Sequence, residues 1–154
     1  MAWRNELHNI LIEKMSFHAF ERLTQQVLRE LGFVQVEVTG RIGDNGIDGK
    51  GIARINGLLS FHIAFQCKKY KGSVGVSAIR EFRGAIKGQV SKGIFITTGS
   101  FTKAAIELAN RDDGITIDLI NGKQLADKLK ELSLGIKTEL VEKVTVDPEW
   151  FLSL

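Results

Sequence analysis

Three polar residues near the middle of the chain have the types that metal-assisted chemistry on a phosphate needs. Asp48 can bind a hard divalent cation, and Gln66 can add a neutral oxygen. Lys68 can hold or deprotonate a water molecule and can stabilise negative charge on a phosphate. A carboxylate, an amide and an ammonium form an unusual group for a protein core. The alternative is a solvent-facing sheet edge that carries a surface ion pair.

Two predicted strands position this group. Residues 47–55 and 58–67 alternate in hydrophobicity and are joined around Asn56-Gly57, a strong hairpin signal. Odd-numbered positions are apolar or small in both strands, so odd must face odd if one face is to be buried. A strict two-residue turn would break this pairing. We therefore expect a three-residue loop, with Gly57 in the left-handed conformation, or one bulge, and the three polar side chains on one face of the sheet.

A fourth candidate comes from a predicted helix. Glu21 lies between Phe17 and Leu28 around the helix, which makes it an acid on the rim of a buried stripe. A buried acid needs a partner, and a cation or Lys68 would serve. The alternative is a rim carboxylate that reaches solvent.

The rest of the chain alternates between helical and strand-like patterns. Ser16 is placed to cap a helix that Gly32 ends. Helices are expected at 3–15, 17–31, 77–87, 101–111 and 122–132, and strands at 33–38, 47–55, 58–67, 93–98, 115–120 and 136–146. The core order α-β-β-β-α-β-α-β-α predicts one α/β domain with a mixed central sheet flanked by helices. The Trp150-Phe151 end is expected to dock on a surface that the sequence does not identify.

Length and composition favour a single folded domain. The chain has 154 residues, of which 44% are hydrophobic and 25% charged, and this balance argues against intrinsic disorder. It has no apolar run of membrane-spanning length and no visible secretory signal, so we expect no membrane association. One cysteine, Cys67, excludes an internal disulfide and fits a cytoplasmic location.

Positive charge is concentrated in one segment. From Lys68 to Lys103 the chain has eight basic residues and a single acid, Glu81. Such a segment suggests a polyanionic partner, and the alternative is a solvated face. A predicted helix carries Arg80, Arg83 and Lys87 on one face, where they could track phosphates. Further candidate contacts are Lys69, Lys71 and Thr98; Thr98 ends a strand and could instead belong to an ordinary helix cap.

Six segments of the chain form an ordered set of motifs. They are Phe20–Leu23, Gly40–Gly49, Gln66–Tyr70, Arg80–Ala85, Gly93–Gly99 and Ile117–Gly122. In order and spacing the set resembles the catalytic domain of Mrr-type restriction endonucleases, which belong to the PD-(D/E)XK nuclease superfamily. The resemblance covers about residues 3 to 136, and it implies a restriction-endonuclease-like fold.

The resemblance implies an endonuclease that hydrolyses phosphodiester bonds of double-stranded DNA in defence against foreign DNA. Mg²⁺ would be the cofactor, with Mn²⁺ as an alternative. Asp48 would be the central metal ligand, Glu21 a second carboxylate, and Gln66 would replace the superfamily's usual second acid. The backbone carbonyl of Cys67 would be a further ligand, and Lys68 would be the motif lysine. One site cuts one strand, so a double-strand break implies a homodimer or paired nicks.

The resemblance also divides the chain. Residues 1–15 would be a linker-type helix, 16–136 the catalytic domain and 137–154 a C-terminal extension. Asp44 would belong to the family's Gly-Asp-x-Gly-x-Asp loop, with an ordering role as an Asx turn favoured. Mrr-like proteins usually carry an N-terminal winged-helix domain that selects modified DNA; no such domain is expected within these residues, and a longer protein could supply it. Two alternatives stay open: a non-catalytic DNA-binding module with this fold, and a junction-resolving nuclease.

Overall fold

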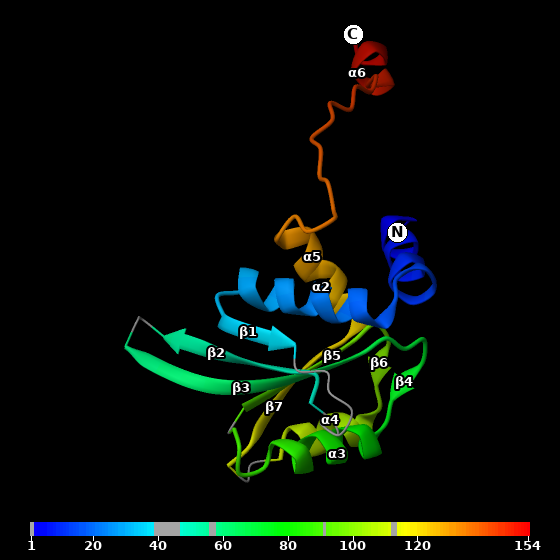
Figure 1. The fold of residues 1–154 in the computed structure, drawn as a ribbon. Helices are drawn as coiled ribbons and strands as arrows, with labels where there is room; N and C mark the ends of the chain where they lie inside the picture. Colours follow the sequence, from blue (N-terminus) through cyan, green and yellow to red (C-terminus); the bar gives the residue numbers. More distant parts are fainter. Residues whose placement is uncertain (1, 39–46, 56–57, 91, 112–113) are drawn as a thin grey trace.

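The computed structural model describes residues 2–38, 47–55, 58–90, 92–111 and 114–154. Its centre is a five-stranded mixed sheet between two layers of helices (Figure 1). In spatial order the strands are β1 (Val34–Val38), β2 (Gly49–Ile55), β3 (Leu59–Lys68), β5 (Lys92–Thr97) and β7 (Thr116–Ile120). The first three strands pair antiparallel, and β3, β5 and β7 pair parallel. The predicted α/β fold class and core element order are confirmed.

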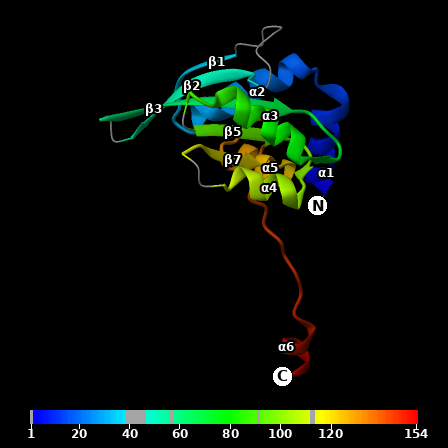
Figure 2. The ribbon, with the colours of Figure 1, turned by 90° about the horizontal axis from the view of Figure 1, so that it is seen from below.

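Helices cover both faces of the sheet (Figures 1 and 2). One layer contains α2 (Phe17–Glu30) and α5 (Gly122–Glu131), joined by α1 (Ala2–Asn9) and the π-helical turn η1 (Ile10–Lys14). The other layer contains α3 (Val76–Ile86) and α4 (Lys103–Ala109). A small second sheet pairs β4 (Ser73–Val74) with β6 (Ser100–Phe101). Among the described residues, no helix has the length and apolar character that a membrane span requires.

Two hydrophobic clusters lie on opposite faces of the sheet. Phe20, Leu28 and Phe65 belong to the cluster under α2 and α5, whereas Phe82 and Phe95 belong to the cluster under α3 and α4. Strand β5 is buried on both faces because its successive residues enter the two clusters in turn. This explains why β5 reads as a continuous apolar run in the sequence.

The register of the β2–β3 hairpin is the expected one. Odd positions pair with odd positions throughout, from Gly49 opposite Phe65 to Ile55 opposite Leu59. Three residues therefore separate the paired ends, as the parity argument required, while the conformation of Gly57 lies outside the described residues. Gly49 has a packing role, since a Cβ atom there would lie 2.2 Å from the Phe65 ring. The alternation stops before β2, because Ile47 packs in the cluster under α3 and α4.

The ends of helix α2 follow local sequence signals. The hydroxyl of Ser16 accepts a hydrogen bond from the N–H of Ala19, and Gly32 has a φ of 103° just after the helix. The buried stripe differs from the expectation at its first member, since Phe17 is 42% exposed. It lies in the first turn, before the helix comes to lie on the sheet.

The expectation for the C-terminus was wrong. Residues 136–147 form no strand, and the chain runs away from the domain to the short helix α6 (Pro148–Leu152) (Figures 1 and 2). A strand needs a partner for its backbone hydrogen bonds, and this segment pairs with neither edge strand, β1 or β7. Trp150 and Phe151 are 56% and 60% exposed, and their docking on another surface stays a prediction.

The prediction that Arg83 lies on an exposed basic face of α3 was wrong. Arg83 is only 8% exposed, and its guanidinium donates to the carbonyl oxygens of Leu108, Arg111 and Ile115. The helix turns this position towards α4 and the start of β7, where the last carbonyls of α4 lack partners within their own helix. Arg83 therefore holds two elements together, and Arg80 and Lys87 remain exposed.

Replacement of Arg83 tests this structural role. Arg83→Ala removes the donors of several buried carbonyl groups, so we expect a loss of about 2–4 kcal/mol in the free energy of unfolding. Arg80→Ala, on the exposed side of the same helix, should change it by less than about 0.5 kcal/mol. Thermal or urea unfolding measures both. Equal unfolding midpoints for the two variants would contradict the assignment.

Candidate active site

Asp48 is fixed where β2 begins, beside the end of β3. Its N–H donates to the carbonyl of Phe65 at 2.9 Å, and its Oδ2 accepts from the N–H of Cys67 at 2.8 Å. The Asp48 carboxylate thus accepts the hydrogen bond that a backbone carbonyl would accept if the β2–β3 pairing continued as far as Cys67. Burial raises the pKa of Asp48; the hydrogen bond from the Cys67 amide opposes this rise, and the charge of Glu21 adds to it.

Glu21 reaches the same place from helix α2. It is 3% exposed, and its Oε1 lies 3.1 Å from Nδ1 of His18, whose side chain is 83% exposed. Thr24, one turn further along α2, is 1% exposed and also faces Cys67. Two carboxylates, of Asp48 and Glu21, therefore approach each other beside the end of β3 with little solvent around them. This is the buried-acid arrangement that the sequence left open for Glu21.

Gln66 and Lys68 flank Cys67 on the strand. They alternate with it and so belong to the side of β3 that carries Ala64, a member of the cluster under α3 and α4. The Oε1 atom of Gln66 is buried and has no hydrogen-bond partner among the described residues. Lys68 is exposed, and its Nζ lies 5.0 Å from the centroid of the Tyr70 ring.

The expectation that Asp48 shares one face with Gln66 and Lys68 is not met. Alternation fails between Ile47 and Gly49, because the chain has not yet entered β2 there. The contacts of Asp48 are instead with the backbone of Cys67 and with Glu21 on the α2 side. The candidate residues thus meet around the end of β3 from both sides of the sheet.

Two threonines of β5 and the following turn fix the backbone after Lys68. The hydroxyl of Thr97 donates to the carbonyl of Lys68 at 2.9 Å. The hydroxyl of Thr98 accepts from the N–H of Tyr70 and donates to its carbonyl, both at 2.7 Å. Because Thr98 is 1% exposed and its hydroxyl is fully engaged, the expectation that it holds a phosphate was wrong. The helix cap is Thr102, whose hydroxyl accepts from the N–H of Ala105.

Lys69 also has a structural role in place of the expected DNA contact. Its Nζ donates to the carbonyl oxygens of Ile12 and Met15, at 2.9 and 2.5 Å. These carbonyls lie at the end of the helical segment α1–η1 and need donors from outside it. Lys69 therefore attaches the N-terminal segment to the residue that follows Lys68. Lys71 is exposed, and its expected contact with DNA stays a prediction.

The oxygen atoms at the end of β3 form a donor set for a hard cation. They are the carboxylates of Asp48 and Glu21, the unpartnered amide oxygen of Gln66, and the backbone carbonyl of Cys67. That carbonyl points to the Asp48 side, because the N–H and C=O of one strand residue share a direction. Among the described residues, no three His, Cys, Asp or Glu side chains gather into a metal site. Burial raises the pKa of the Cys67 thiol, which therefore stays protonated and is no soft ligand.

Sequence reasoning missed three residues of this site. His18 contacts Glu21, Thr24 lies beside Cys67, and Thr97 holds the Lys68 carbonyl. The spacing of three residues on a helix, from His18 to Glu21 and on to Thr24, was a usable signal. Nothing in the sequence could connect Thr97 with Lys68, because β3 and β5 pair only in the folded sheet. Asp44 lies outside the described residues.

Comparisons with a family of proteins and with individual relatives agree on one family. Residues 12–129 match the family Mrr_cat, described as a restriction endonuclease. The Type IV methyl-directed restriction enzyme EcoKMrr of Escherichia coli (strain K12) is 31% identical over 150 residues, which are 94% of this chain and 47% of that protein. The chain thus spans less than half the length of the curated relatives it matches.

Two solved structures share the fold. The DNA modification-dependent restriction endonuclease AspBHI gives a TM-score of 0.74 at 23% identity, over 88% of this chain and 36% of that one. The MspJI restriction endonuclease, in complex with a 27-mer oligonucleotide, gives a TM-score of 0.63 at 24% identity, over 99% of this chain and 39% of that one. Identities this low support the fold alone.

The strain of two approaching carboxylates can be measured without any metal. Asp48→Asn keeps an acceptor for the Cys67 amide and removes a desolvated charge beside Glu21, so stability in EDTA at pH 7 should rise by about 1 kcal/mol. A raised pKa means that this penalty develops as pH rises through the folded-state value. The gain should therefore be smaller at pH 4 than at pH 7.

The matched control is Asp118→Asn, at an exposed acid on β7. Its effect on the free energy of unfolding should stay within about 0.5 kcal/mol at both pH values. Urea unfolding in EDTA supplies the measurement. A loss of stability in Asp48→Asn at pH 7 would mean that the carboxylate stabilises the metal-free fold.

Proposed function

Because this chain belongs to the Mrr-type restriction endonuclease family, we propose that it is a Mg²⁺-dependent endonuclease that hydrolyses phosphodiester bonds of DNA. One observation carries the proposal beyond family membership. The carboxylates of Asp48 and Glu21 approach each other at the end of β3, and the buried amide oxygen of Gln66, on the other side of that strand, has no partner among the described residues. Among the described residues, the groups that contact these carboxylates are the His18 ring, beside Glu21, and the Cys67 amide, beside Asp48.

A divalent cation fits this donor set. Carboxylate, amide and carbonyl oxygens are the ligands that Mg²⁺ takes, and Mn²⁺ accepts the same set. Asp48, Glu21, Gln66 and the Cys67 carbonyl would hold the ion. When bound, it would supply a nucleophilic hydroxide at neutral pH and stabilise charge on the phosphate. Gln66 contributes no charge, so the buried Glu21 supplies the second carboxylate.

Lys68 has a separate role in the proposed reaction, and its neighbours position it. The ammonium of Lys68 would lie against the phosphate and stabilise the negative charge that develops during cleavage. Its position depends on the backbone bonds that Thr97 and Thr98 make to Lys68 and Tyr70. The Tyr70 ring, whose centroid lies 5.0 Å from the Lys68 Nζ, would attract the ammonium through its π-face and help to position it.

Double-stranded DNA is the proposed partner. Exposed Lys71, Arg80 and Lys87 would contact phosphates, which contributes affinity without reading bases. One site cuts one strand, so two copies or two successive nicks would produce a double-strand break. Dependence on DNA modification is proposed only for a longer protein in which a separate domain selects the target.

Cleavage of supercoiled plasmid tests the proposal directly. Wild-type protein should nick plasmid in Mg²⁺ or Mn²⁺ and leave it intact in EDTA. Asp48→Ala should lower the rate by about 10³-fold or more, since a lost ligand removes several kcal/mol of stabilisation. It should still bind DNA in EDTA, because the basic surface is unchanged. Asp118→Ala, remote from the site, is the control and should cut at the wild-type rate.

Methylated and unmethylated plasmids are compared in the same assay. Cleavage by Asp48→Ala at the wild-type rate would overturn the catalytic assignment. DNA binding with no cleavage in either metal would favour the non-catalytic DNA-binding module instead.

DNA binding by the chain alone should be weak and nearly indifferent to sequence. Methylated and unmethylated duplexes should differ by less than about tenfold in affinity, which is about 1.4 kcal/mol. Arg80→Ala combined with Lys87→Ala should lower affinity equally for all sequences. If each residue contacts one phosphate, the slope of log affinity against log salt should fall by about two.

Fluorescence anisotropy over a range of salt concentrations in EDTA provides these values. The control carries Lys137→Ala and Lys143→Ala, with the same charge change in the C-terminal segment. An unchanged salt slope in the Arg80/Lys87 variant would exclude the α3 surface from DNA binding.

A further inference from the structure

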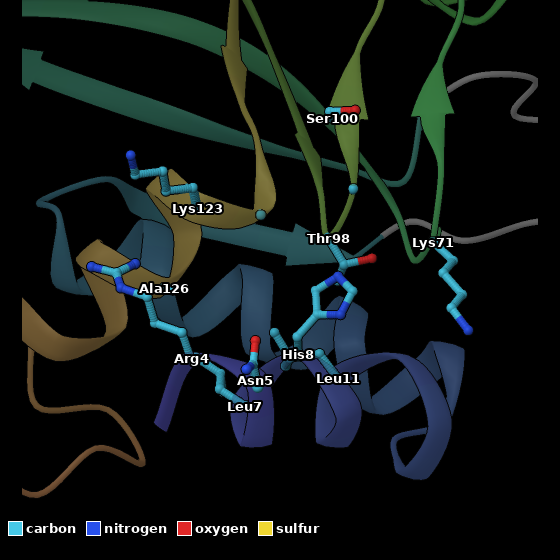
Figure 3. A pocket seen from close by; sticks show the side chains of 12 residues that line it. Arg4, Asn5, Leu7, His8, Leu11, Lys71, Thr98, Ser100, Lys123 and Ala126 are labelled. Atoms are coloured by element: carbon cyan, nitrogen blue, oxygen red, sulfur yellow. The ribbon is translucent and has the colours of Figure 1, made fainter. Parts of the chain in front are cut away.

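A pocket of about 440 Å³ opens between α1, the start of α5 and the turns that follow β3 and β5 (Figure 3). Its volume lies in the range of small-ligand sites, roughly 300–1,000 Å³. Its lining includes Arg4, His8, Lys71, Ser100, Lys123 and Ala126. None of the candidate catalytic residues lines it. It is therefore separate from the group at the end of β3, although Lys71 follows that strand closely in the chain.

The lining has a strong excess of positive charge. Arg4, Lys71 and Lys123 contribute to it, and the described residues that line the pocket include no Asp or Glu. Two acids lie nearby: Asp127, which forms an ion pair with Arg4, and Glu13, which lines an adjoining pocket together with His8 and Lys71. The hydrogen bond from Arg4 lowers the pKa of Asp127, and the charges of Arg4, Lys123 and Lys130 contribute further. Asp127 thus faces several cations, whereas Lys71 has Glu13 in its surroundings.

The polar groups free to bind a ligand are side chains of α1, Lys71 and Lys123. Among the described residues, the side chains of Asn5, His8, Lys71 and Lys123 make no hydrogen bond or short ion pair. In Figure 3 the His8 ring projects into the space between α1 and Thr98. The other hydroxyl groups of the wall are already engaged: that of Ser100 bonds to that of Ser73, and that of Thr98 bonds to the backbone of Tyr70.

Two glycines shape the wall opposite α1. A Cβ atom at Gly99 would lie 2.0 Å from the carbonyl oxygen of Gly72, and one at Gly122 would lie 2.0 Å from that of Thr98. The three turns can approach this closely only because both positions lack side chains. Leu7, Leu11 and Ala126 add an apolar surface on the other side. The pocket therefore combines an apolar part with a cationic rim.

We propose that this pocket binds a phosphate group carried on a nucleotide-sized ligand, with Lys71 and Lys123 as the anchoring cations. Lysine binds phosphate as a mobile point charge. In Figure 3 Lys71 and Lys123 lie on opposite sides of the pocket and extend outwards, so either side chain would turn inwards to reach a phosphate bound between them. The apolar part accommodates the sugar. A free nucleotide and a phosphodiester of a DNA strand share this chemistry. The strand as a source rests on the proposed nuclease function, whereas the phosphate site does not.

The test uses the whole chain in EDTA, so that no cleavage occurs. The probes are thymidine, thymidine 5′-monophosphate, the dinucleotide pTpT and inorganic phosphate, each titrated by calorimetry and followed by amide NMR shifts. The pocket variant combines Lys71→Gln with Lys123→Gln. Its control combines Lys137→Gln with Lys143→Gln, which makes the same charge change in the C-terminal segment.

Thymidine 5′-monophosphate should bind wild type and control with equal affinity and the pocket variant at least tenfold more weakly. The shifted amides should include those of Lys71, Ser100 and Lys123. Thymidine should bind much more weakly than its monophosphate. All four exchanged lysines are exposed, so both variants should keep the wild-type melting temperature.

Tighter binding of pTpT than of the monophosphate assigns the pocket to a strand; tighter binding of the monophosphate or of inorganic phosphate assigns it to a free ligand. Equal affinity of the pocket variant and its control, or amide shifts confined to other surfaces, would overturn the proposal. If the wild-type protein binds nucleotides but cleaves no plasmid in Mg²⁺ or Mn²⁺, the nuclease function is rejected and the phosphate site remains.

Discussion

The hydrogen bond from the Cys67 amide to the Asp48 carboxylate joins the end of β3 to the residue that directly precedes β2. It brings a charged oxygen to a backbone position that a neutral carbonyl would otherwise fill. Burial raises the pKa of this acid, and Glu21 approaches it from α2. The fold therefore holds two carboxylates close together with little solvent around them. A protein keeps such an arrangement where the gain lies in function, because stability alone disfavours it.

Two threonine hydroxyls and the ammonium of Lys69 fix the backbone around the end of β3. Thr97 and Thr98 bind the backbone of Lys68 and Tyr70, so the exposed Lys68 ammonium projects from a fixed base. Lys69 binds the last carbonyls of the N-terminal helical segment. Consecutive residues of the motif thus have different tasks: a half-buried amide at Gln66, a core thiol at Cys67, an exposed cation at Lys68 and a structural anchor at Lys69.

The basic segment shows how folding divides a uniform charge pattern. Arg83 binds carbonyl groups between two elements, Lys69 anchors the N-terminal segment, and Lys92 pairs with Asp118 across neighbouring strands. The remaining basic residues of the segment stay exposed: Lys68, Lys71, Arg80, Lys87 and Lys103. Composition alone therefore overstated the charge available to a polyanion. Position decided which charges compensate backbone carbonyls and which face the solvent.

The sequence by itself determined the α/β order, the odd-to-odd register of the hairpin and the cap of α2, because period, parity and capping are local properties. The motif set also indicated the family. Only the tertiary structure decided the roles of Arg83, Thr98 and Lys69, because their partners lie 25 or more residues away along the chain. The tertiary structure also decided on which face of the sheet the Asp48 side chain makes its contacts, because alternation holds only inside a strand. Residues 136–147 form no strand, because a strand forms only beside a partner.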